Sequence, residues 1–416
     1  METNLKKNQT ILINVFGHAN LGDGALVESC FAICDKANKP IDFGVALYPE
    51  TEARYINIPW YKRLISKPRK SSLKNILHST RAFILLLLIN LKCPLFFQAF
   101  ILTKNEKNIL EKARDSIVIA CPGGYLEDSN PSYVINLLNI ILFSYVSKIT
   151  VLAPMSIGPV NSRLGKYLIS IMLKKCDKIF CRETYSLKFA TSILPDNKKD
   201  NIAYCGDIAF LYKPNTLSLS YAISKSSNKS FNNNHHKSIG ITIVSWGFTG
   251  SHNPELSKNM YRINMTNLLN YLINEKLFDV TIVNQVQSDI PFSREICKNF
   301  QVNLLENERS VSDHLALIST FDFFVGSRFH SCIFSMLTKT PFVCLSYLPK
   351  CSEMMNDLDL FDLMLNLYDL NSEYQIKEHV SKFIDDSSLA GRASRSVSNY
   401  QEQCKSFGQY LSTIDL

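Results

Sequence analysis

The chain has 416 residues, 46% of them hydrophobic, which is enough for two domains with cores of their own and argues against extensive disorder. Its formal net charge of +8 is modest for this length. The twelve cysteines include no Cys-x-x-Cys pair, which excludes a zinc framework of that spacing and predicts reduced, buried thiols. Residues 1–8 are too polar and too few for a secretory signal, and together these features predict a cytoplasmic protein.

The positive charge is concentrated in residues 61–112, which contain eleven Lys or Arg against two Glu. They surround an apolar run at residues 82–89 that Asn90, Lys92 and Pro94 interrupt, so it is too short for a transmembrane helix. Two interpretations stay open: a core helix with solvated basic flanks, or a basic surface that lies on anionic lipid. No nucleic-acid-binding module is recognisable, so no nucleic acid partner is expected.

A first strand is expected at residues 11–16, and it runs directly into a glycine-rich turn at residues 17–24. Apolar residues at helical spacing follow from Leu26 onward. The turn has neither the G-x-G-x-x-G spacing of a dinucleotide site nor a Walker lysine. It is therefore either a ligand-binding turn of another kind or a structural turn with Asp23 as the helix N-cap.

Other strands of this half also end in polar turns. The strand expected at residues 117–120 leads into Cys121-Pro122-Gly123-Gly124 and then into carboxylates that include Asp128. A strand at residues 178–181 ends at Arg182. The remaining expected elements are helices at 136–145 and 163–175 and a strand at 149–154.

Residues 213–237 are rich in Ser and Asn without an apolar period, which indicates a linker. The adjacent His235 and His236 have no partners at ligand spacing, so no metal site is predicted. Further elements follow the linker: strands at 239–244 and 280–283 and helices at 267–274, 312–318 and 394–411.

The most informative stretch is residues 321–350. A buried strand at 321–325 is followed by Gly326 and then by Arg328 and His330 at the start of an apolar helix, and a second strand is expected at 342–345. In a parallel sheet this turn lies at the carboxyl end of the strand and faces free amides of the helix N-terminus, where α/β proteins bind anions. Arg and His can also stand at such a turn for packing reasons alone.

Both halves repeat strand, polar turn and helix, which predicts an α/β protein with two Rossmann-like lobes, parallel sheets and a GT-B-like arrangement. The lobes are expected at residues 1–212 and 238–416, joined by the linker. The terminal helix is expected to pack back on the first lobe.

Several motifs in this order resemble the polysaccharide pyruvyl transferase family. The resemblance spans residues 17–350 and is most distinctive in G-S-R-F-H-S with Y-x-x-K, here Tyr347 to Lys350. The other matching motifs are G-x-x-N-x-G-D at residues 17–23, a G-G-x-x-x-D element ending at Asp128, in which Pro122 replaces the first family glycine, a partial G-I-G-P at 156–159, R-E at 182–183 and D-x-A-F at 207–210.

The resemblance implies transfer of the carboxyvinyl unit of phosphoenolpyruvate to a sugar diol, as a pyruvate ketal. Phosphoenolpyruvate is then the donor substrate, no cofactor is implied, and the first lobe holds the acceptor while the second holds the donor. The acceptor would be a cell-surface polysaccharide or its lipid-linked precursor. The second of these would bring a cytoplasmic protein into peripheral contact with the anionic inner face of the membrane. His330 is the implied acid, and the implied substrate-binding residues are Arg328, Arg182, Lys350, Asp23, Asp128, Asn20 and Gly124.

Two other functions are compatible with this fold. One is a glycosyltransferase that uses a nucleotide sugar, although the second half lacks the pair of glutamates eight residues apart that retaining enzymes of this kind carry. The other is a binding protein that has lost activity, which the presence of Arg328 and His330 disfavours.

Overall fold

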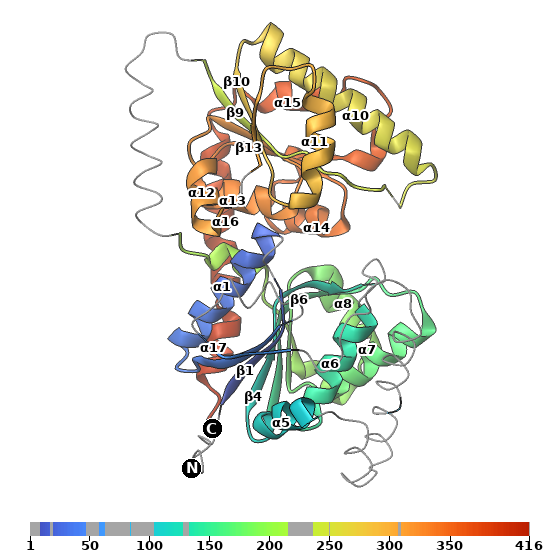
Figure 1. Ribbon diagram of the computed structural model, residues 1–416, viewed down its shortest axis with the longest axis vertical. Coiled ribbons are helices and arrows are strands. Elements are labelled where there is room, and N and C mark those ends of the chain that lie inside the picture. Colours follow the sequence, from blue (N-terminus) through green and yellow to red (C-terminus); the bar gives the residue numbers. More distant parts are fainter. Residues whose placement is uncertain are drawn as a thin grey trace. The chain divides into compact units, whose positions relative to one another are not determined.

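The computed structural model describes residues 9–16, 20–46, 58–62, 84, 104–127, 133–214, 236–248, 250–306 and 309–415 (Figure 1). The chain forms two compact units. The first comprises Met1–His18, Leu26–Ile208 and Gln403–Leu416, and the second comprises Ala19–Ala25 and Ala209–Glu402.

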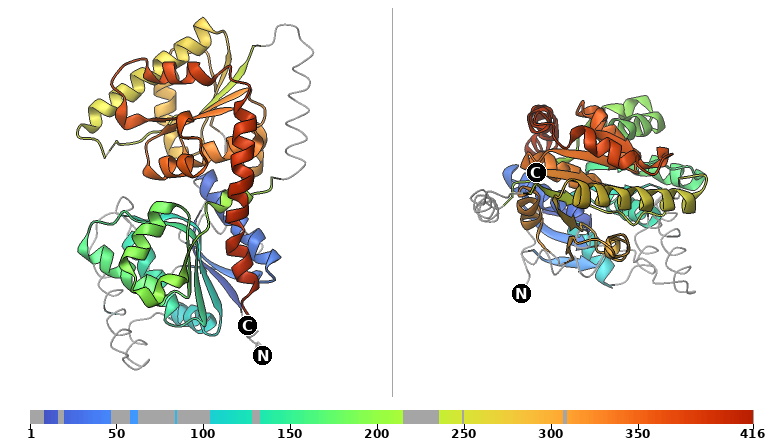
Figure 2. Two further views of the ribbon diagram at one scale, coloured as in Figure 1. Left: turned by 180° about the vertical axis from the view of Figure 1, so that it is seen from behind. Right: turned by 90° about the horizontal axis from the view of Figure 1, so that it is seen from above.

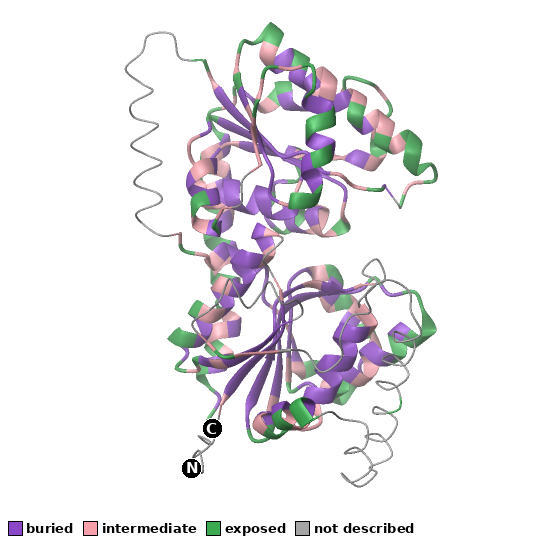
Figure 3. Cartoon of the chain, viewed as in Figure 1, coloured by how far each residue is buried: buried purple, intermediate pink, exposed green. Residues whose placement is uncertain are grey.

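The first unit is built on an eight-stranded sheet in which every pairing is parallel. Its strands are nearly continuous apolar runs, as expected for a parallel sheet that is covered on both faces (Figure 3). In spatial order they are β3 (Trp60–Lys62), β2 (Ile41–Ala46), β1 (Thr10–Val15), β4 (Ile117–Ala120), β6 (Ile149–Ile157), β7 (Lys178–Cys181) and β8 (Ile202–Tyr204), with β5 (Gly123–Leu126) paired to β6.

Helices cover this sheet on both faces (Figures 1 and 2). The helix α17 (Ser406–Ser412) lies on the face opposite α6 (Tyr133–Ser144) and α7 (Arg163–Lys175), and its Phe407 packs edge-on against Phe180 of β7 with 5.4 Å between the ring centroids. The helices are α1 (Leu21–Lys36), α5 (Lys104–Ala113), α6 (Tyr133–Ser144), α7 (Arg163–Lys175), α8 (Thr184–Ile193) and α17 (Ser406–Ser412), with 3₁₀ turns at Asp196–Asn201 and Ile208–Leu211.

The second unit has a six-stranded parallel sheet. Its strands, in spatial order, are β11 (Asn303–Leu305), β10 (Asp279–Val283), β9 (Ser238–Ile241), β12 (Phe323–Gly326), β13 (Phe342–Ser346) and β14 (Met364–Asn366). The helices are α10 (Pro254–Asn270, continued by a π turn at Tyr271–Glu275), α11 (Ile290–Cys297), α12 (Val311–Ile318), α13 (Phe329–Thr338), α14 (Pro349–Asp357), α15 (Gln375–Phe383) and α16 (Leu389–Cys404), with 3₁₀ turns at Gln287–Asp289, Phe361–Leu363 and Leu367–Asp369.

Strand order reverses once in this second sheet. From β9 the chain moves outward to β10 and β11, and from β12 it moves the other way to β13 and β14. In open α/β sheets ligands bind at the carboxyl ends of the strands beside such a reversal. The turns after β9 and β12 are therefore the expected place for a ligand in this unit.

The predicted fold class, two α/β units with parallel sheets, is confirmed. Every cysteine in the described residues is free and buried, as predicted. Most of the basic segment (63–83 and 85–103) and of the linker (215–235), including His235, lies outside the described residues. In the portion that is described, no helix combines the length and the apolar character needed to span a bilayer.

Candidate anion-binding site

The turn between β12 and α13 is tied to the neighbouring strand β9. The amide of Ser327 donates to Thr242 Oγ1, just past β9, at 2.7 Å. A Cβ at Gly326 would lie 2.7 Å from Cys332 Sγ, so any larger residue here would have to displace the cysteine side chain. Ser331 Oγ closes the turn by accepting from the Arg328 amide at 3.2 Å and donating to the Arg328 carbonyl at 2.6 Å. Arg328 is thereby fixed as the N-cap residue of α13.

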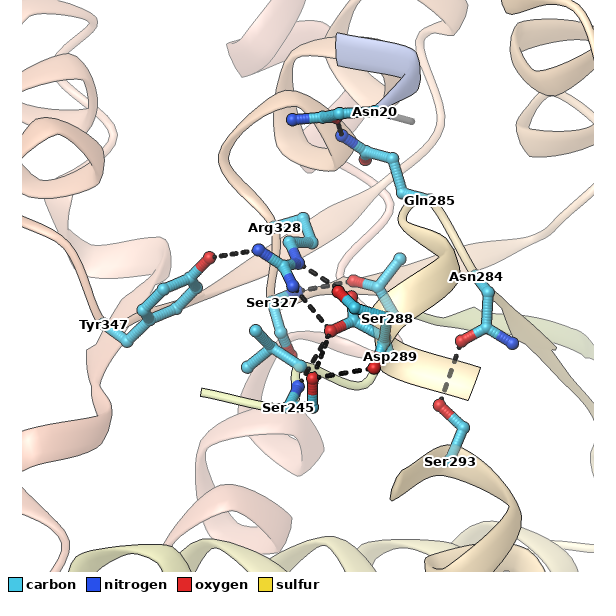
Figure 4. Close-up of polar contacts among 12 residues, drawn as sticks. Asn20, Ser245, Asn284, Gln285, Ser288, Asp289, Ser293, Ser327, Arg328 and Tyr347 are labelled. Atoms are coloured by element: carbon cyan, nitrogen blue, oxygen red, sulfur yellow. Dashed lines mark hydrogen bonds and ion pairs between the residues drawn. The ribbon is translucent and has the colours of Figure 1, made fainter. Parts of the chain in front are cut away.

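The guanidinium of Arg328 is held by two side chains from other strand ends (Figure 4). Its Nε and Nη2 donate to the two carboxylate oxygens of Asp289 at 2.8 and 2.5 Å, and its Nη1 donates to the hydroxyl of Tyr347 at 2.9 Å. Burial lowers the pKa of Arg328, but Tyr347 and Asp289 outweigh it, and the net pKa lies above its usual value. The side chain keeps 19% of its surface exposed, against 1% for Asp289.

Asp289 and Tyr347 are themselves fixed. The Asp289 carboxylate also accepts from the amide and the hydroxyl of Ser245, each at 2.9 Å. The Tyr347 ring lies 5.1 Å from that of Trp246, whose indole N–H donates to Tyr368 at 3.0 Å. Burial raises the pKa of the Tyr347 phenol well above its usual range. A rigid, protonated phenol therefore adjoins the guanidinium.

His330 is the second residue of α13 and is 6% exposed. Its ring lies 4.9 Å from that of Phe329 and packs against Gly22 of α1, where any Cβ would overlap the imidazole. The first turns of α1 and α13 therefore meet at this histidine. Lys350, near the start of α14, lies 5.8 Å from the centroid of the Phe329 ring.

Asn20 directly precedes α1 and belongs, with the first turn of that helix, to the second unit. Its Oδ1 accepts from the Gly22 amide at 3.0 Å and from Gln285 Nε2 at 3.3 Å, and its Nδ2 donates to Asp23 at 3.0 Å. Asn20 also forms an antiparallel bridge with Val286. The alternative with Asp23 as N-cap is therefore corrected, because Asn20 fills that position and Asp23 lies in the first turn.

Five of the predicted site residues thus fall in the second unit: Asn20, Asp23, Arg328, His330 and Lys350. Two others fall in the first, where Gly124 lies in β5 and Arg182 follows β7. Asp128 lies outside the described residues.

Arg182 is 2% exposed and fully engaged by its own unit. It pairs with Glu183 at 3.3 Å and Asp207 at 3.2 Å, and it donates to Ser156 at 2.5 Å. A substrate anion would compete with two carboxylates for this guanidinium. Its role in binding the donor stays a prediction.

Sequence reasoning assigned no role to Asp289, Tyr347 or Ser245. Each follows a strand directly or closely, at the carboxyl end where functional side chains gather in parallel sheets. Their position just after predicted strands could therefore have identified them as candidate site residues. The described residues contain no group of three or more His, Cys, Asp or Glu that could hold a metal ion.

Solved structures with the same fold cover nearly the whole chain. A protein described as a UDP-N-acetylglucosamine 2-epimerase from Listeria monocytogenes matches with a TM-score of 0.59 and 10% identity, covering 98% of both chains. S. aureus MnaA, solved with UDP, matches with a TM-score of 0.58 and 12% identity over 98% of both chains. Anabaena HepE, solved with UDP and glucose, matches with a TM-score of 0.55 and 11% identity over 98% of this chain and 100% of its own.

No curated protein sequence matches the chain. The model of the family described as "Polysaccharide pyruvyl transferase" matches residues 20–349. This range contains four of the five predicted site residues of the second unit and ends one residue before the fifth, Lys350. The match extends over most of the sequence and ends two residues after Tyr347. The chain therefore belongs to the polysaccharide pyruvyl transferase family, and it is a transferase.

Proposed function

We propose that this protein transfers the carboxyvinyl unit of phosphoenolpyruvate to two hydroxyls of a sugar and so forms a cyclic pyruvate ketal. The acceptor is a cell-surface polysaccharide or its lipid-linked precursor. Membership of the family supports the reaction class. The observation that carries the donor assignment is the guanidinium of Arg328, held in one orientation by Asp289 at the strand reversal of the second unit.

The reaction needs a proton donor and an anion site but no redox step. Protonation of the methylene carbon breaks the double bond and leaves a cationic centre, to which the first sugar hydroxyl adds with loss of its proton. Phosphate then departs with the electrons of its C–O bond, and the second hydroxyl adds to the new cation. One hydroxyl proton balances the methyl group and the other leaves with phosphate.

The residues of the second unit have the chemistry for these steps. A guanidinium binds carboxylate or phosphate through directed N–H donors and stays charged, which suits Arg328. His330 is proposed as the acid, because imidazole gives and takes protons near neutral pH. Lys350 adds positive charge, and Asp23 and Asn20 are proposed to bind sugar hydroxyls. Arg182, Gly124 and Asp128 are proposed substrate contacts of the first unit.

Calorimetry with phosphoenolpyruvate and with a panel of UDP-sugars tests this proposal. The protein is expected to bind phosphoenolpyruvate and none of the UDP-sugars. It is expected to release inorganic phosphate from phosphoenolpyruvate only when a sugar diol is present. A product with a ketal methyl signal in its NMR spectrum would identify the bond formed. Tight binding of a UDP-sugar without binding of phosphoenolpyruvate would instead identify a nucleotide-sugar transferase, the alternative that the fold also accommodates.

A further inference from the structure

The hydroxyl of Tyr347 has a proton that no described residue accepts. Arg328 Nη1 lies 2.9 Å from the hydroxyl oxygen, and a guanidinium has donors only, so the tyrosine oxygen must be the acceptor in this contact. A phenol that accepts one hydrogen bond still has its own O–H to donate. The side chain is 3% exposed, so bulk water does not readily take that proton. A buried donor of this kind needs an acceptor.

Two N–H groups of Arg328 have no acceptor among the described residues. Asp289 takes the Nε hydrogen and one hydrogen of Nη2, while Tyr347 takes one hydrogen of Nη1. One N–H remains on each terminal nitrogen. Because Asp289 occupies the Nε side of the guanidinium, these two hydrogens define the part of Arg328 that a ligand can approach.

The pairing with Asp289 also weakens the electrostatic attraction that Arg328 exerts on an anion. A fully ionised Arg–Asp pair has no net charge, so directed hydrogen bonds must supply much of the attraction that a lone arginine would supply through its charge. A neutral phenol suits this role, because it donates a short hydrogen bond to an anionic oxygen and pays less desolvation than a second buried cation. The raised pKa of Tyr347, caused first by burial, keeps the phenol protonated.

Resting on the proposed function, we infer that Tyr347 is a further substrate-binding residue, whose hydroxyl binds an anionic oxygen of phosphoenolpyruvate together with the remaining N–H of Arg328 Nη1. The two donor atoms lie 2.9 Å apart, so one oxygen can lie within hydrogen-bond distance of both. Asp289 and Ser245 are positioning residues, because Asp289 holds the guanidinium and Ser245 holds Asp289.

Tyr347→Phe tests the inference, since it removes the hydroxyl and keeps the ring against Trp246. Phosphoenolpyruvate affinity is expected to fall about ten- to a hundredfold, the usual cost of a hydrogen bond to a charged group. Tyr271→Phe is the control, because this buried tyrosine of the same unit lies in the π turn after α10, where its ring faces Lys276 and Lys377 instead of Arg328. It should bind the donor as the parent does. Tyr347→Gln, with an amide oxygen for Arg328 and an N–H for the substrate, should recover part of the affinity.

Separate titrations with inorganic phosphate and with pyruvate identify which anionic group Tyr347 meets, because the phenylalanine variant should lose affinity for one and keep it for the other. If the parent binds phosphoenolpyruvate and Tyr347→Phe binds it equally well, the inference is wrong and the proposed function stands. If the parent binds phosphate but not phosphoenolpyruvate, the proposed function is wrong. In that case Tyr347 remains an anion-binding residue only if Tyr347→Phe binds phosphate more weakly than the parent does. A parent that binds none of the three would overturn both.

Discussion

Arg328 is already paired before any substrate arrives, and its planar shape is what the pairing uses. Asp289 engages Nε and Nη2 while Tyr347 engages Nη1, so three directions in the guanidinium plane are fixed. A lysine ammonium cannot reproduce this pattern, because it is a point charge on a flexible stem. Charge and orientation can therefore be separated experimentally at this position.

Arg328→Lys should keep a positive charge and still weaken phosphoenolpyruvate binding, by roughly 1.5–3 kcal/mol for the lost charged hydrogen bonds. Calorimetry measures the change. Arg294→Lys is the matched control, since Arg294 pairs side-on with Glu306 through the same two nitrogens but lies 62% exposed. Parental affinity in Arg328→Lys would show that charge alone attracts the donor.

His330→Gln should separate catalysis from binding. Loss of a general acid is expected to lower turnover by about 10²–10⁴-fold, while Arg328 continues to hold the donor. Phosphate-release kinetics give turnover, and calorimetry gives affinity. The exposed His236→Gln serves as control. A variant with parental turnover would leave His330 a packing residue, and one that no longer binds phosphoenolpyruvate would make it a ligand.

The sequence predicted Arg328 and His330 as neighbours because both lie on one strand-turn-helix unit. It did not predict their partners. Asp289 and Tyr347 follow β10 and β13, and only the spatial order of the strands brings these ends to β12. Strand order depends on packing between distant segments, which a single sequence does not display.

At the scale of elements, the contact between α1 and α13 depends on the absence of one side chain. Gly22 lies at a helical position, and its neighbour is the His330 ring. Gly22→Ala should displace this ring and lower turnover while leaving donor affinity nearly unchanged, because Arg328 is not touched. Comparison of kcat with calorimetric affinity separates the two effects.

Gly391→Ala in α16 is the control for the Gly22 experiment. An added Cβ there meets only Arg395 Nη1, at an ordinary 3.7 Å, and alanine favours a helix over glycine. It should therefore be neutral or slightly stabilising. If Gly22→Ala behaved in the same way, the packing of α1 on His330 would have no part in catalysis.

Elements with a clear apolar period were predicted well, and those that depend on capping were not. The predicted bounds of α7 equal the observed ones, Arg163–Lys175. For α10 only residues 267–274 were predicted, although the helix begins at Pro254. Its first turns were missed because they are polar and largely exposed. Asn253 as N-cap and Pro254 in the first turn are nevertheless typical of a helix N-terminus and could have placed its start. The strand β2 was missed because Asp42 and Gly44 interrupt its apolar run.

At the scale of the whole molecule, alternation of strands and helices was enough to predict two parallel-sheet units. It was not enough to divide the chain between them. The predicted first lobe ran without a break from residue 1 to residue 212, whereas Ala19–Ala25 belongs with the second unit. Gln403–Leu416 belongs with the first unit, on which the terminal helix was expected to pack. The exchange of Ala19–Ala25 leaves little trace in local sequence, because this segment looks like the start of any other helix.

Acid should destabilise the second unit through His314. This side chain is fully buried in α12 beside Phe334, and neither ring nitrogen has a hydrogen-bond partner among the described residues. Burial, with a smaller effect of Arg309, lowers its pKa from 6.5 to about 3. Between those values the unfolded chain binds a proton that the folded one does not. The free energy of unfolding should therefore fall as pH drops from 6.5 toward 3, by at most about 1.4 kcal/mol per pH unit.

His314→Leu should flatten this pH dependence, while His236→Leu on the surface should leave it unchanged. Chemical unfolding at several pH values measures both. An equal pH slope in the parent and in His314→Leu would assign the acid sensitivity to other groups.

An acceptor attached to a lipid would bring the protein to the inner face of the membrane, and residues 61–112 supply the basic charge for that contact. The protein should sediment with anionic vesicles at low ionic strength, and salt should release it. Neutral vesicles are the control. Substituting Lys67, Arg69 and Lys70 by Glu should abolish sedimentation, and persistence in this variant would place the contact elsewhere.

The division of the chain also sets an order of assembly during synthesis. Phe180 is made in the first half of translation, yet Phe407, which covers it, leaves the ribosome more than two hundred residues later. The first unit is therefore incomplete while the second is being made. Until α17 is made, its contact with Phe180 on β7 cannot form, and exposed apolar surface of this kind makes folding intermediates prone to aggregate.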